Sequence, residues 1–280
     1  MKYLILILIL SISYSNQISS ISRDINDLSV MNSSHFIKDV TQRKQNNYYR
    51  LSLIQFPANI LARKLSYGFI YKKYFIQSNL SNINYGKLQN SNGDSFIASD
   101  NLLELAIVKQ YDNNFSIGSS LGYSQSKISD YINQSLVHGI GFQKSYKDNK
   151  YITSLTIENM TRTIKSYSNV DIDYSPHISL GLQINMRQLG NSIAFNYVIF
   201  NDYDDEIIIS TKTQIKEIID LYMAKSFYLQ SEDSTINQSF FDKLAFGIDI
   251  DLYPYQFNCG MQSHKDYGFI VGSSLKINIK

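Results

Sequence analysis

From residue 48 onward, apolar and polar residues alternate along the chain with a period of two, the pattern of β-strands with two different faces. In one segment the apolar face carries Phe115, Ile117, Leu121 and Tyr123, and its opposite face carries mostly Ser and Gly. Segments near residues 176–187, 240–252 and 266–279 alternate in the same way. Because the apolar faces run for five or six positions, we expect strands of about 10 to 14 residues, against about 5 or 6 in an average globular strand.

The polar faces are lined by Ser, Gly, Asn and Gln with scattered charges, which favours a wet or tightly packed lumen over a charged solvent surface. A transmembrane β-strand needs about 9 to 11 residues with lipid on one side and polar groups on the other. Lipid cannot satisfy free backbone groups, so such a sheet must close on itself. The pattern predicts an all-β, transmembrane antiparallel barrel of about 14 strands. They are expected near residues 49–56, 65–76, 80–88, 97–111, 113–128, 131–145, 150–160, 176–187, 191–200, 206–218, 220–230, 240–252, 254–263 and 266–279.

The predicted connections also fit a membrane barrel. Those after the even-numbered strands are short, whereas 57–64, 89–96, 161–175 and 231–239 are longer. Short turns on one side and long loops on the other are typical of outer-membrane barrels. The weakest stretch is 206–230, where Lys216 to Asp220 also fits a helix. Tyrosines near strand ends are expected to form interfacial girdles; they are Tyr48, Tyr49, Tyr131, Tyr146, Tyr151, Tyr253, Tyr255 and Tyr267.

The N-terminus has the order of a secretory signal peptide. Lys2 precedes an unbroken Leu/Ile run from Leu4 to Leu10, and Ser13 and Ser15 stand at the −3 and −1 positions of a cleavage site. We therefore expect a signal peptide at 1–15, a plug or periplasmic segment at 16–47 and an outer-membrane barrel at 48–280. The alternative is that the first residues form a buried N-terminal strand.

Composition narrows the class further. The 280 residues carry a net charge of +2, with 18% charged residues, 13% aromatic residues and no Trp. A nucleic-acid binder usually has a basic excess, so we expect no nucleic acid among the partners. The 44% apolar content is too high for a disordered chain. Cys259 is the single cysteine, which excludes an internal disulfide and is expected to face lipid.

Few residues suggest chemistry. The histidines His35, His138, His177 and His264 lack a partner at metal-ligand spacing, and Ser135 and His138 fall on opposite faces of one strand. Asp249 and Asp251 share a polar face with Lys243 and are expected to pair with Arg187 or Lys276 from neighbouring strands. Asp202, Asp204, Asp205 and Glu206 are interpreted as a solvated hairpin tip, with a calcium site as the alternative. We therefore predict no catalytic, cofactor-binding or metal residues, no cofactor and no enzyme.

Residues 83–160 resemble the PorV/PorQ family of outer-membrane barrels, relatives of the FadL-type fatty-acid channels, with the PorQ branch the better fit. The residues that carry the resemblance are Ile83-Asn84-Tyr85-Gly86-Lys87-Leu88, Gly93, Phe96, Ala98-Ser99-Asp100, Phe115-Ser116-Ile117-Gly118, Tyr123-Ser124, Ile128, Tyr131, Gly139-Ile140-Gly141-Phe142 and Glu158-Asn159. The resemblance implies a 14-stranded barrel with an N-terminal segment in or under the lumen. It also implies a role in type IX secretion.

The expected function is a non-catalytic outer-membrane barrel in type IX protein secretion or cell-surface attachment of exported proteins. Its partners would be outer-membrane lipid and other secretion or attachment proteins, which would contact loops 161–175, 201–205 and 231–239. One alternative is a FadL-like channel for hydrophobic small molecules. A secreted adhesive or structural β-protein, with a sandwich or β-helix fold, is the other.

Overall fold

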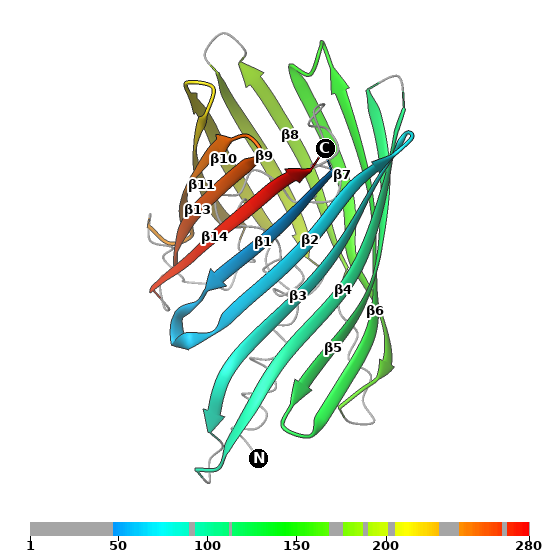
Figure 1. The fold of residues 1–280 in the computed structure, drawn as a ribbon, viewed down its shortest axis with the longest axis vertical. Helices are drawn as coiled ribbons and strands as arrows, with labels where there is room; N and C mark the ends of the chain where they lie inside the picture. The colour runs from blue at the N-terminus through cyan, green and yellow to red at the C-terminus, as the bar shows by residue number, and fades with distance from the viewer. Residues whose placement is uncertain are drawn as a thin grey trace.

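The computed structural model describes residues 47–89, 93–111, 114–167, 176–186, 190–200, 205–229, 241–264 and 268–279. Across these residues fourteen antiparallel strands pair in chain order, and β1 pairs with β14 to close the barrel (Figure 1). The strands are β1 (Asn47–Gln55), β2 (Leu61–Tyr71), β3 (Tyr74–Gln89), β4 (Ser95–Tyr111), β5 (Phe115–Ile128), β6 (Tyr131–Tyr146), β7 (Tyr151–Lys165), β8 (His177–Met186), β9 (Asn191–Phe200), β10 (Asp205–Ile215), β11 (Ile219–Leu229), β12 (Leu244–Leu252), β13 (Tyr255–His264) and β14 (Gly268–Ile279). The predicted all-β, 14-stranded barrel is confirmed.

A short 3-10 turn, Pro57–Asn59, joins β1 to β2. No helix within the described residues has the length and apolar character needed to cross a membrane. The predicted signal peptide and N-terminal segment lie outside the described residues, except for Asn47, which begins β1.

The wall is taller on one side than on the other. Strands β3 to β7 have 14 to 17 residues, whereas β8 to β14 have 9 to 12. In Figure 1, β3 to β6 reach further than their neighbours at the end opposite to the last residue of β14. The longest strands therefore exceed the roughly 9 to 11 residues with which a transmembrane β-strand crosses a bilayer.

Several strand boundaries differ from the prediction, most clearly around β2 and β3. The expected strand 65–76 is interrupted by a turn at Lys72 and Lys73, and its last residues belong to β3, which begins at Tyr74. At its other end β2 begins four residues earlier than predicted, at Leu61. Apolar and aromatic residues flank the two lysines on both sides, so the sequence pattern does not indicate a turn here. The helix alternative near 216 is also wrong, because Lys216 has a positive φ of 53° and begins a turn that leads into β11.

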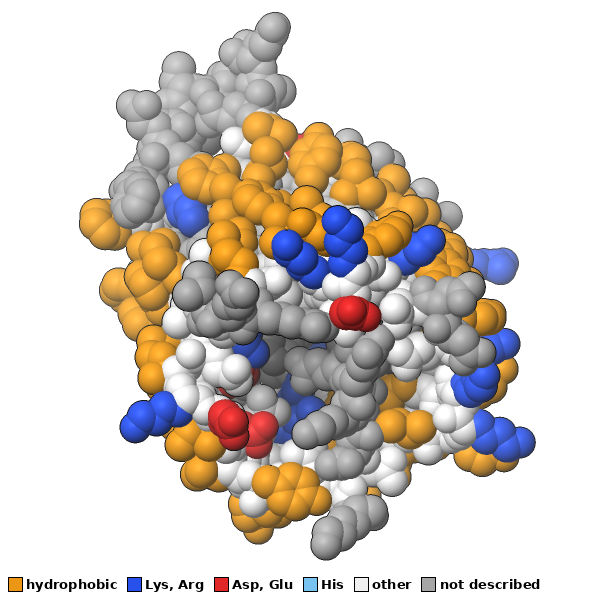
Figure 2. Space-filling model, turned by 90° about the horizontal axis from the view of Figure 1, so that it is seen from above, with side chains coloured by type: hydrophobic (Ala, Val, Ile, Leu, Met, Phe, Trp, Pro, Cys, Tyr) orange, Lys and Arg blue, Asp and Glu red, His pale blue; other side chains and the backbone are white. Residues whose placement is uncertain are grey.

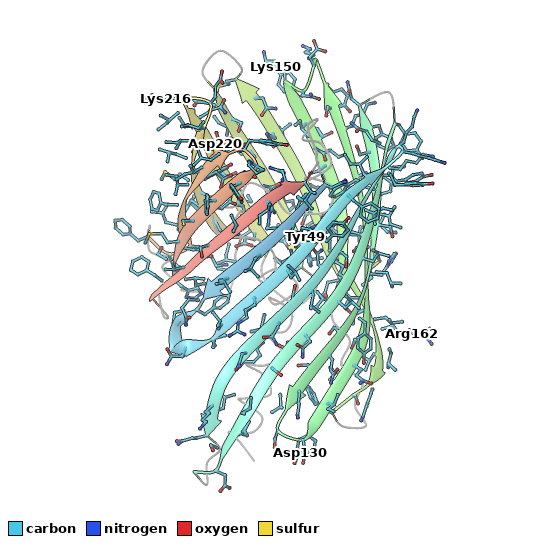
Figure 3. The ribbon with its side chains drawn as sticks, in the orientation of Figure 1. Tyr49, Asp130, Lys150, Arg162, Lys216 and Asp220 are labelled. Atoms are coloured by element: carbon cyan, nitrogen blue, oxygen red, sulfur yellow. The ribbon has the colours of Figure 1, made fainter. Side chains whose placement is uncertain are left out.

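The connections follow the predicted asymmetry in part. Those after the even-numbered strands have two to four residues, as expected, and Figure 3 places Lys150, Lys216 and Asp220 near this end of the barrel. At the other end, 166–176 and 230–243 are long, but β5 turns into β6 through two residues. The predicted loop 57–64 is wrong because β2 already begins at Leu61. The first residues of the predicted loop 161–175 belong to β7, which ends at Lys165.

The two faces of the wall are chemically different, as the alternation predicts. In β1, Tyr48, Arg50 and Ser52 are buried, whereas Leu51 and Leu53 are about half exposed. The same outward exposure recurs at Leu121, Leu180 and Phe257 on other strands. Cys259 is also exposed, in the outward row of Phe257 and Met261, which agrees with its predicted lipid-facing position. The barrel therefore carries an apolar outer surface around a polar interior.

The apolar outer surface forms a band with defined edges on β3 to β5. On β4 it consists of Leu103, Leu105 and Ile107, all more than 40% exposed. Towards the long-loop end it stops at Asn101, whose Oδ1 accepts a 2.9 Å hydrogen bond from Asn82 Nδ2. At the short-turn end it stops at Lys109. The eight steps from Asn101 to Lys109 span about 26 Å along the strand, a length that on a strand tilted by about 40° approaches the roughly 25 Å apolar band of outer-membrane barrels.

Tyr48 corrects one prediction about the girdles. Its side chain is 1% exposed and points inward, where its ring stacks on Phe75 with centroids 6.3 Å apart. Gly68 lies directly opposite it on β2. A Cβ at Gly68 would lie 2.5 Å from Tyr48 Cε1 and 3.0 Å from Phe75 Cζ. Glycine at this position therefore makes room for the buried ring.

We expect Gly68→Ala to lower the free energy of unfolding by about 1 to 3 kcal/mol, because the methyl group overpacks a site with no space for it. Ser66→Ala, on the same strand and the same face, is the matched control. Both are measured by urea unfolding in lipid vesicles. Combining Gly68→Ala with Tyr48→Ala should recover part of the loss, and a purely additive double variant would contradict the proposed packing.

Candidate functional site: the barrel lumen

The inward face of the wall is built mainly from small polar residues. Eleven serines are at most 6% exposed: Ser52, Ser66, Ser81, Ser116, Ser120, Ser135, Ser179, Ser192, Ser210, Ser226 and Ser274. Serine side chains are small, so they leave room next to the wall for water or for a polypeptide segment. A buried polar group normally has a hydrogen-bond partner. The inward face can therefore form hydrogen bonds with water or with a polar chain segment in the lumen.

Several of these groups have no hydrogen-bond partner among the described residues. They are the hydroxyls of Ser135, Thr156, Ser179 and Ser210 and the side-chain amide nitrogen of Asn196. Each of these side chains is at most 2% exposed. Thr156 and Ser179 are direct partners in the β7–β8 pairing. These positions form a neutral, hydroxyl-rich stretch on β6 to β10.

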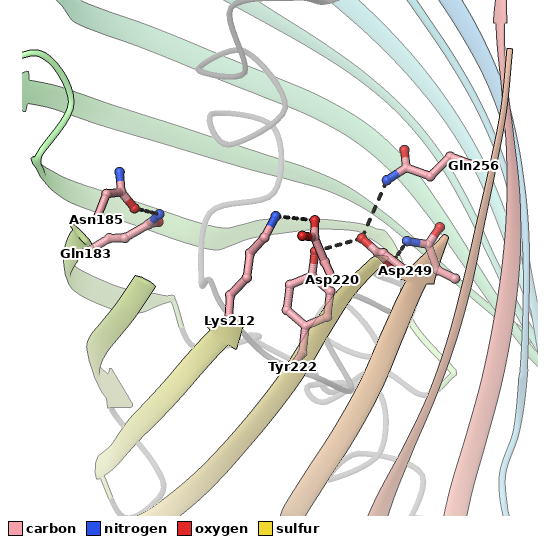
Figure 4. A network of polar contacts seen from close by, with 8 residues as sticks. Gln183, Asn185, Lys212, Asp220, Tyr222, Asp249 and Gln256 are labelled. Atoms are coloured by element: carbon pink, nitrogen blue, oxygen red, sulfur yellow. Dashed lines mark hydrogen bonds and ion pairs between the residues drawn. The ribbon is translucent and has the colours of Figure 1, made fainter. Parts of the chain in front are cut away.

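A second stretch of the wall carries a charged network centred on Asp249 of β12 (Figure 4). Its Oδ2 accepts a 2.7 Å hydrogen bond from the Tyr222 hydroxyl and a longer one, 3.5 Å, from Gln256 Nε2. Its Oδ1 accepts from Asn258 Nδ2, and the Asn258 amide oxygen accepts from the Ser274 hydroxyl at 2.9 Å. Asp249 is 6% exposed, so these contacts replace the hydration of its charge.

Positive charges face the same network. The buried Arg50 guanidinium of β1 interacts electrostatically with Asp249 and lies 5.4 Å from the centre of the Tyr48 ring. Lys276 Nζ lies 4.5 Å from the centre of that ring. Lys212 of β10 pairs with Asp220 of β11 at 2.5 Å. Because acidic and basic groups are interleaved here, the lumen wall is polar without being strongly selective for one sign of charge.

The sequence prediction for these carboxylates is confirmed only in outline. Asp249 lies close to basic groups, but these are Arg50 of β1 and Lys212 of β10 and not the predicted Lys276, and the neighbouring strands supply the neutral hydrogen-bond donors Tyr222, Asn258 and Gln256. Arg187 lies outside the described residues. Lys243 is not part of this network: it lies before β12 at the long-loop end, where it pairs with Glu206 at 2.9 Å and lies over the Tyr228 ring.

Two further polar groups line the wall of β3 to β5. Asn79 Nδ2 donates to Glu104 Oε2 at 2.9 Å, and Gln77 Nε2 donates to Asn79 Oδ1 at 3.0 Å. Further along, Asp100 accepts from the Tyr85 hydroxyl at 2.6 Å and from the Ser126 hydroxyl. These carboxylates are held by neutral donors, which again gives a structured polar lining.

A buried histidine–carboxylate pair is the feature that the sequence did not reveal. His177 Nε2 of β8 lies 3.0 Å from Glu158 Oε2 of β7, and both residues are at most 6% exposed. They are direct partners in the strand pairing, and the His177 ring lies 5.7 Å from that of Phe200. Nineteen residues separate the pair in sequence. Only the strand register, which alternation does not fix, could have brought them together.

The other predicted positions give no catalytic constellation. His138 faces away from the lumen and its Nδ1 lies 2.7 Å from the Ser120 carbonyl oxygen, whereas Ser135 faces inward, as their spacing predicted. His264 is the last residue of β13. His35 lies outside the described residues. Within the described part of the chain, no three His, Cys, Asp or Glu side chains are grouped so that they could hold a metal ion.

The acidic stretch 202–206 is only partly described. Asp205 and Glu206 belong to β10, where Asp205 accepts from the Tyr197 hydroxyl and Glu206 pairs with Lys243. Asp202 and Asp204 lie outside the described residues, as do most of the loops 161–175 and 231–239. The predicted partner-binding loops therefore stay predictions.

Comparison with known proteins supports the fold and no narrower class. No family model and no curated protein matches the chain. Among solved structures, the toluene transporter TodX of P. putida superposes with a TM-score of 0.55 at 12% identity, over 91% of this chain and 94% of that one. The outer membrane protein Omp33 of Acinetobacter baumannii gives a TM-score of 0.50 at 8% identity, over 84% and 98%.

CdiB from Acinetobacter baumannii matches at 10% identity with a TM-score of 0.46, and the chain spans 60% of its length. At such identities a likeness concerns the fold alone. TodX and Omp33 share with this chain a closed barrel that is covered over almost its full length. The chain therefore has the fold of outer-membrane β-barrels.

Proposed function

We propose that the protein is a non-catalytic outer-membrane barrel, exported by a cleaved signal peptide at 1–15, that serves in protein secretion or in surface attachment of exported proteins. The observation that carries the membrane part is the two-faced wall. Its exposed side chains form an apolar band on the outer face, whereas its inward side chains are mostly polar. A water-soluble β-protein gains nothing from such an exposed apolar band.

Residues 16–46 are proposed to enter the lumen from its end. β1 begins at Asn47, at the short-turn end of the barrel. The unpartnered hydroxyls on β6 to β10 are suited to the backbone N–H and C=O groups of a polypeptide, which need polar partners in any dry interior. A cysteine pair joining Ser179 to a position in 16–46 should then form a disulfide in the folded barrel, and failure at every position tried would argue for a periplasmic segment.

The secretion role rests on the likeness of residues 83–160 to the PorV/PorQ family. Those residues form β3 to β7, the tall side of the wall, whose projecting ends would offer a platform for exported or surface-bound proteins. The test is deletion of the gene in its host, followed by assay of type IX cargo in the medium and on the cell surface. Loss of secretion or attachment is expected, and unchanged cargo would overturn this role.

A channel for hydrophobic small molecules is the second candidate, because the fold resembles that of a toluene transporter. The lumen argues against it, since Arg50, Asp249, Glu158 and the buried serines line its wall. A hydrophobic solute would have to displace their hydrogen bonds without replacing them, which costs free energy. Uptake of a radiolabelled aromatic hydrocarbon by cells with and without the gene distinguishes the two functions.

A further inference from the structure

A belt of lysines and tyrosines surrounds part of the barrel at the short-turn end. We call it the lysine–tyrosine rim; it consists of Lys72, Lys109, Lys144, Lys147 and Lys150 with Tyr71, Tyr74, Tyr111, Tyr146 and Tyr151. All of them belong to β2 to β7 or to the turns between these strands. Lys and Arg side chains around this end are visible in the view along the barrel (Figure 2).

Each lysine of the rim lies over a tyrosine ring. The Nζ of Lys109 is 5.7 Å from the centre of the Tyr74 ring and 4.8 Å from that of Tyr111. The corresponding distances are 5.3 Å from Lys72 to Tyr71 and 5.1 Å from Lys144 to Tyr146. Lys147 and Lys150 both lie over Tyr151, at 5.7 and 5.5 Å. The rim is therefore an ordered alternation of cations and aromatic rings.

The rim faces outward, and most of its side chains are exposed, whereas Lys109 and Tyr151 are half-buried. Tyr71, Tyr111 and Tyr146 expose 57%, 42% and 43% of their surfaces. Lys109 and Tyr111 occupy the same outward row of β4 as Leu103, Leu105 and Ile107. Lys109 is paired in register with Tyr74 and with Ile117, so the belt continues across neighbouring strands. The apolar band thus runs directly into a cationic border, without a gap between them.

Among the described residues at this end, lysines without an adjacent acidic residue gather on one side of the barrel. At the same end of β10 to β13, the exposed side chains include Ile215, Ile218, Leu252, Tyr253 and Tyr255. There Lys212 is engaged with Asp220, and Lys216 is next to Glu217 in one turn. On the β2–β7 side, the described turns and strand ends carry Lys73 in addition to the five rim lysines, against Asp148. A general solubilising charge would be spread around the whole circumference.

We propose that the lysine–tyrosine rim binds anionic glycerophospholipids, which would form a one-sided annulus around β2 to β7. This inference rests on the proposed membrane location. A ligand here must place acyl chains on Leu105 and Ile107 and a negative headgroup at Lys109, and an anionic lipid has this arrangement. Lysine ammonium groups attract lipid phosphates, and tyrosine hydroxyls prefer the headgroup region. An acidic protein surface would match the lysines but would leave the adjoining apolar band uncovered.

The test is native mass spectrometry of the folded full-length barrel with phosphatidylglycerol or phosphatidylcholine. The rim variant carries Lys72→Gln, Lys109→Gln and Lys144→Gln. The matched control carries Lys87→Gln, Lys127→Gln and Lys165→Gln, an equal loss of charge at the other end of the barrel. One cationic side chain near an anionic surface is worth about fivefold in affinity. We expect phosphatidylglycerol to remain bound to the unaltered chain and to the control, and to bind the rim variant at least tenfold more weakly.

Equal retention of the two lipids, equal binding by the rim variant, or an equal loss in the control would each overturn the proposal. Displacement of the lipid by millimolar glycerol phosphate would also overturn it, since a site for the headgroup alone would not need the apolar band. Folding into neutral phosphatidylcholine vesicles is measured first for every chain by heat-modifiable migration. A chain that does not fold there contradicts the membrane location, whereas folding without lipid preference contradicts only the rim proposal.

Discussion

Leu105→Arg should lower the free energy of unfolding in vesicles by about 2 to 4 kcal/mol, because it places a cation near the middle of the apolar band. Leu105 is 48% exposed on the outer face of β4, between Leu103 and Ile107. In a water-soluble protein the same substitution at an exposed position would cost close to nothing. The size of the effect therefore distinguishes lipid from water at the outer surface.

Ile97→Arg is the matched control for this variant. Ile97 lies in the same outward row of the same strand and is 57% exposed, but beyond Asn101 at the long-loop end. If the band ends at the Asn82–Asn101 pair, arginine at 97 meets water or headgroups and should cost about 0 to 1 kcal/mol. Because the chain has no Trp, unfolding is followed by heat-modifiable migration during urea titration. Equal effects at 97 and 105 would rule out the proposed position of the bilayer.

Alternation alone predicted the barrel, its strand number and the two faces. It succeeded because burial on only one side of a strand imposes a period of two, and because the outward row must satisfy lipid while the inward row satisfies polar groups. The same rule could have placed Tyr48 correctly. Tyr48 shares its face with Arg50 and Ser52, whereas Tyr49 shares its face with Leu51 and Leu53. The position of Tyr48 near a strand end suggested an interfacial girdle, but its side chain points inward because it lies on the polar face of β1.

Strand boundaries and cross-strand partners were harder to predict, for different physical reasons. The turn at Lys72 and Lys73 contains neither Gly nor Asn, although the backbone of Lys72 has a positive φ of 56°, so the usual turn signal is missing. The pairing of Glu158 with His177, and of Tyr222 with Asp249, depends on the register between neighbouring strands. Loop lengths and bulges set that register, as at Asn159, whose φ of 60° marks an irregularity in β7.

The polar lumen and the apolar outer band together account for the low proportion of charged residues, 18% of the chain. A low proportion of charged residues fits the proposed membrane location, in which one face of the wall meets lipid and the other lines a polar lumen. Many of the charges that are present lie near the ends of the strands or are paired in the lumen, as with Lys212 and Asp220. A charged side chain in the lumen is tolerated where neighbouring side chains compensate its charge. Removing such a side chain should therefore destabilise the barrel, because its neighbours lose their partner.

Asp249→Leu is expected to be among the most destabilising single substitutions in the barrel. It removes the acceptor of Tyr222, Asn258 and Gln256 and leaves the buried Arg50 without its acidic neighbour. Removing a buried acceptor leaves its donors without a partner, at about 1 to 3 kcal/mol each, and the loss of the nearby negative charge adds to this cost. Urea unfolding in vesicles measures this loss. Asp251→Leu, two residues along the same inward row but exposed, should change stability by less than about 0.5 kcal/mol.

Removing the opposite charge at the same time should separate the electrostatic part of this loss from the hydrogen-bond part. The double variant Arg50→Leu, Asp249→Leu no longer contains an uncompensated cation, so it should be more stable than the sum of the two single effects by about 1 to 3 kcal/mol. Strict additivity would mean that Arg50 and Asp249 do not interact. The network would then be held by the Tyr222 and Asn258 hydrogen bonds alone, and the positive groups of β1 and β14 would face the lumen for a separate reason.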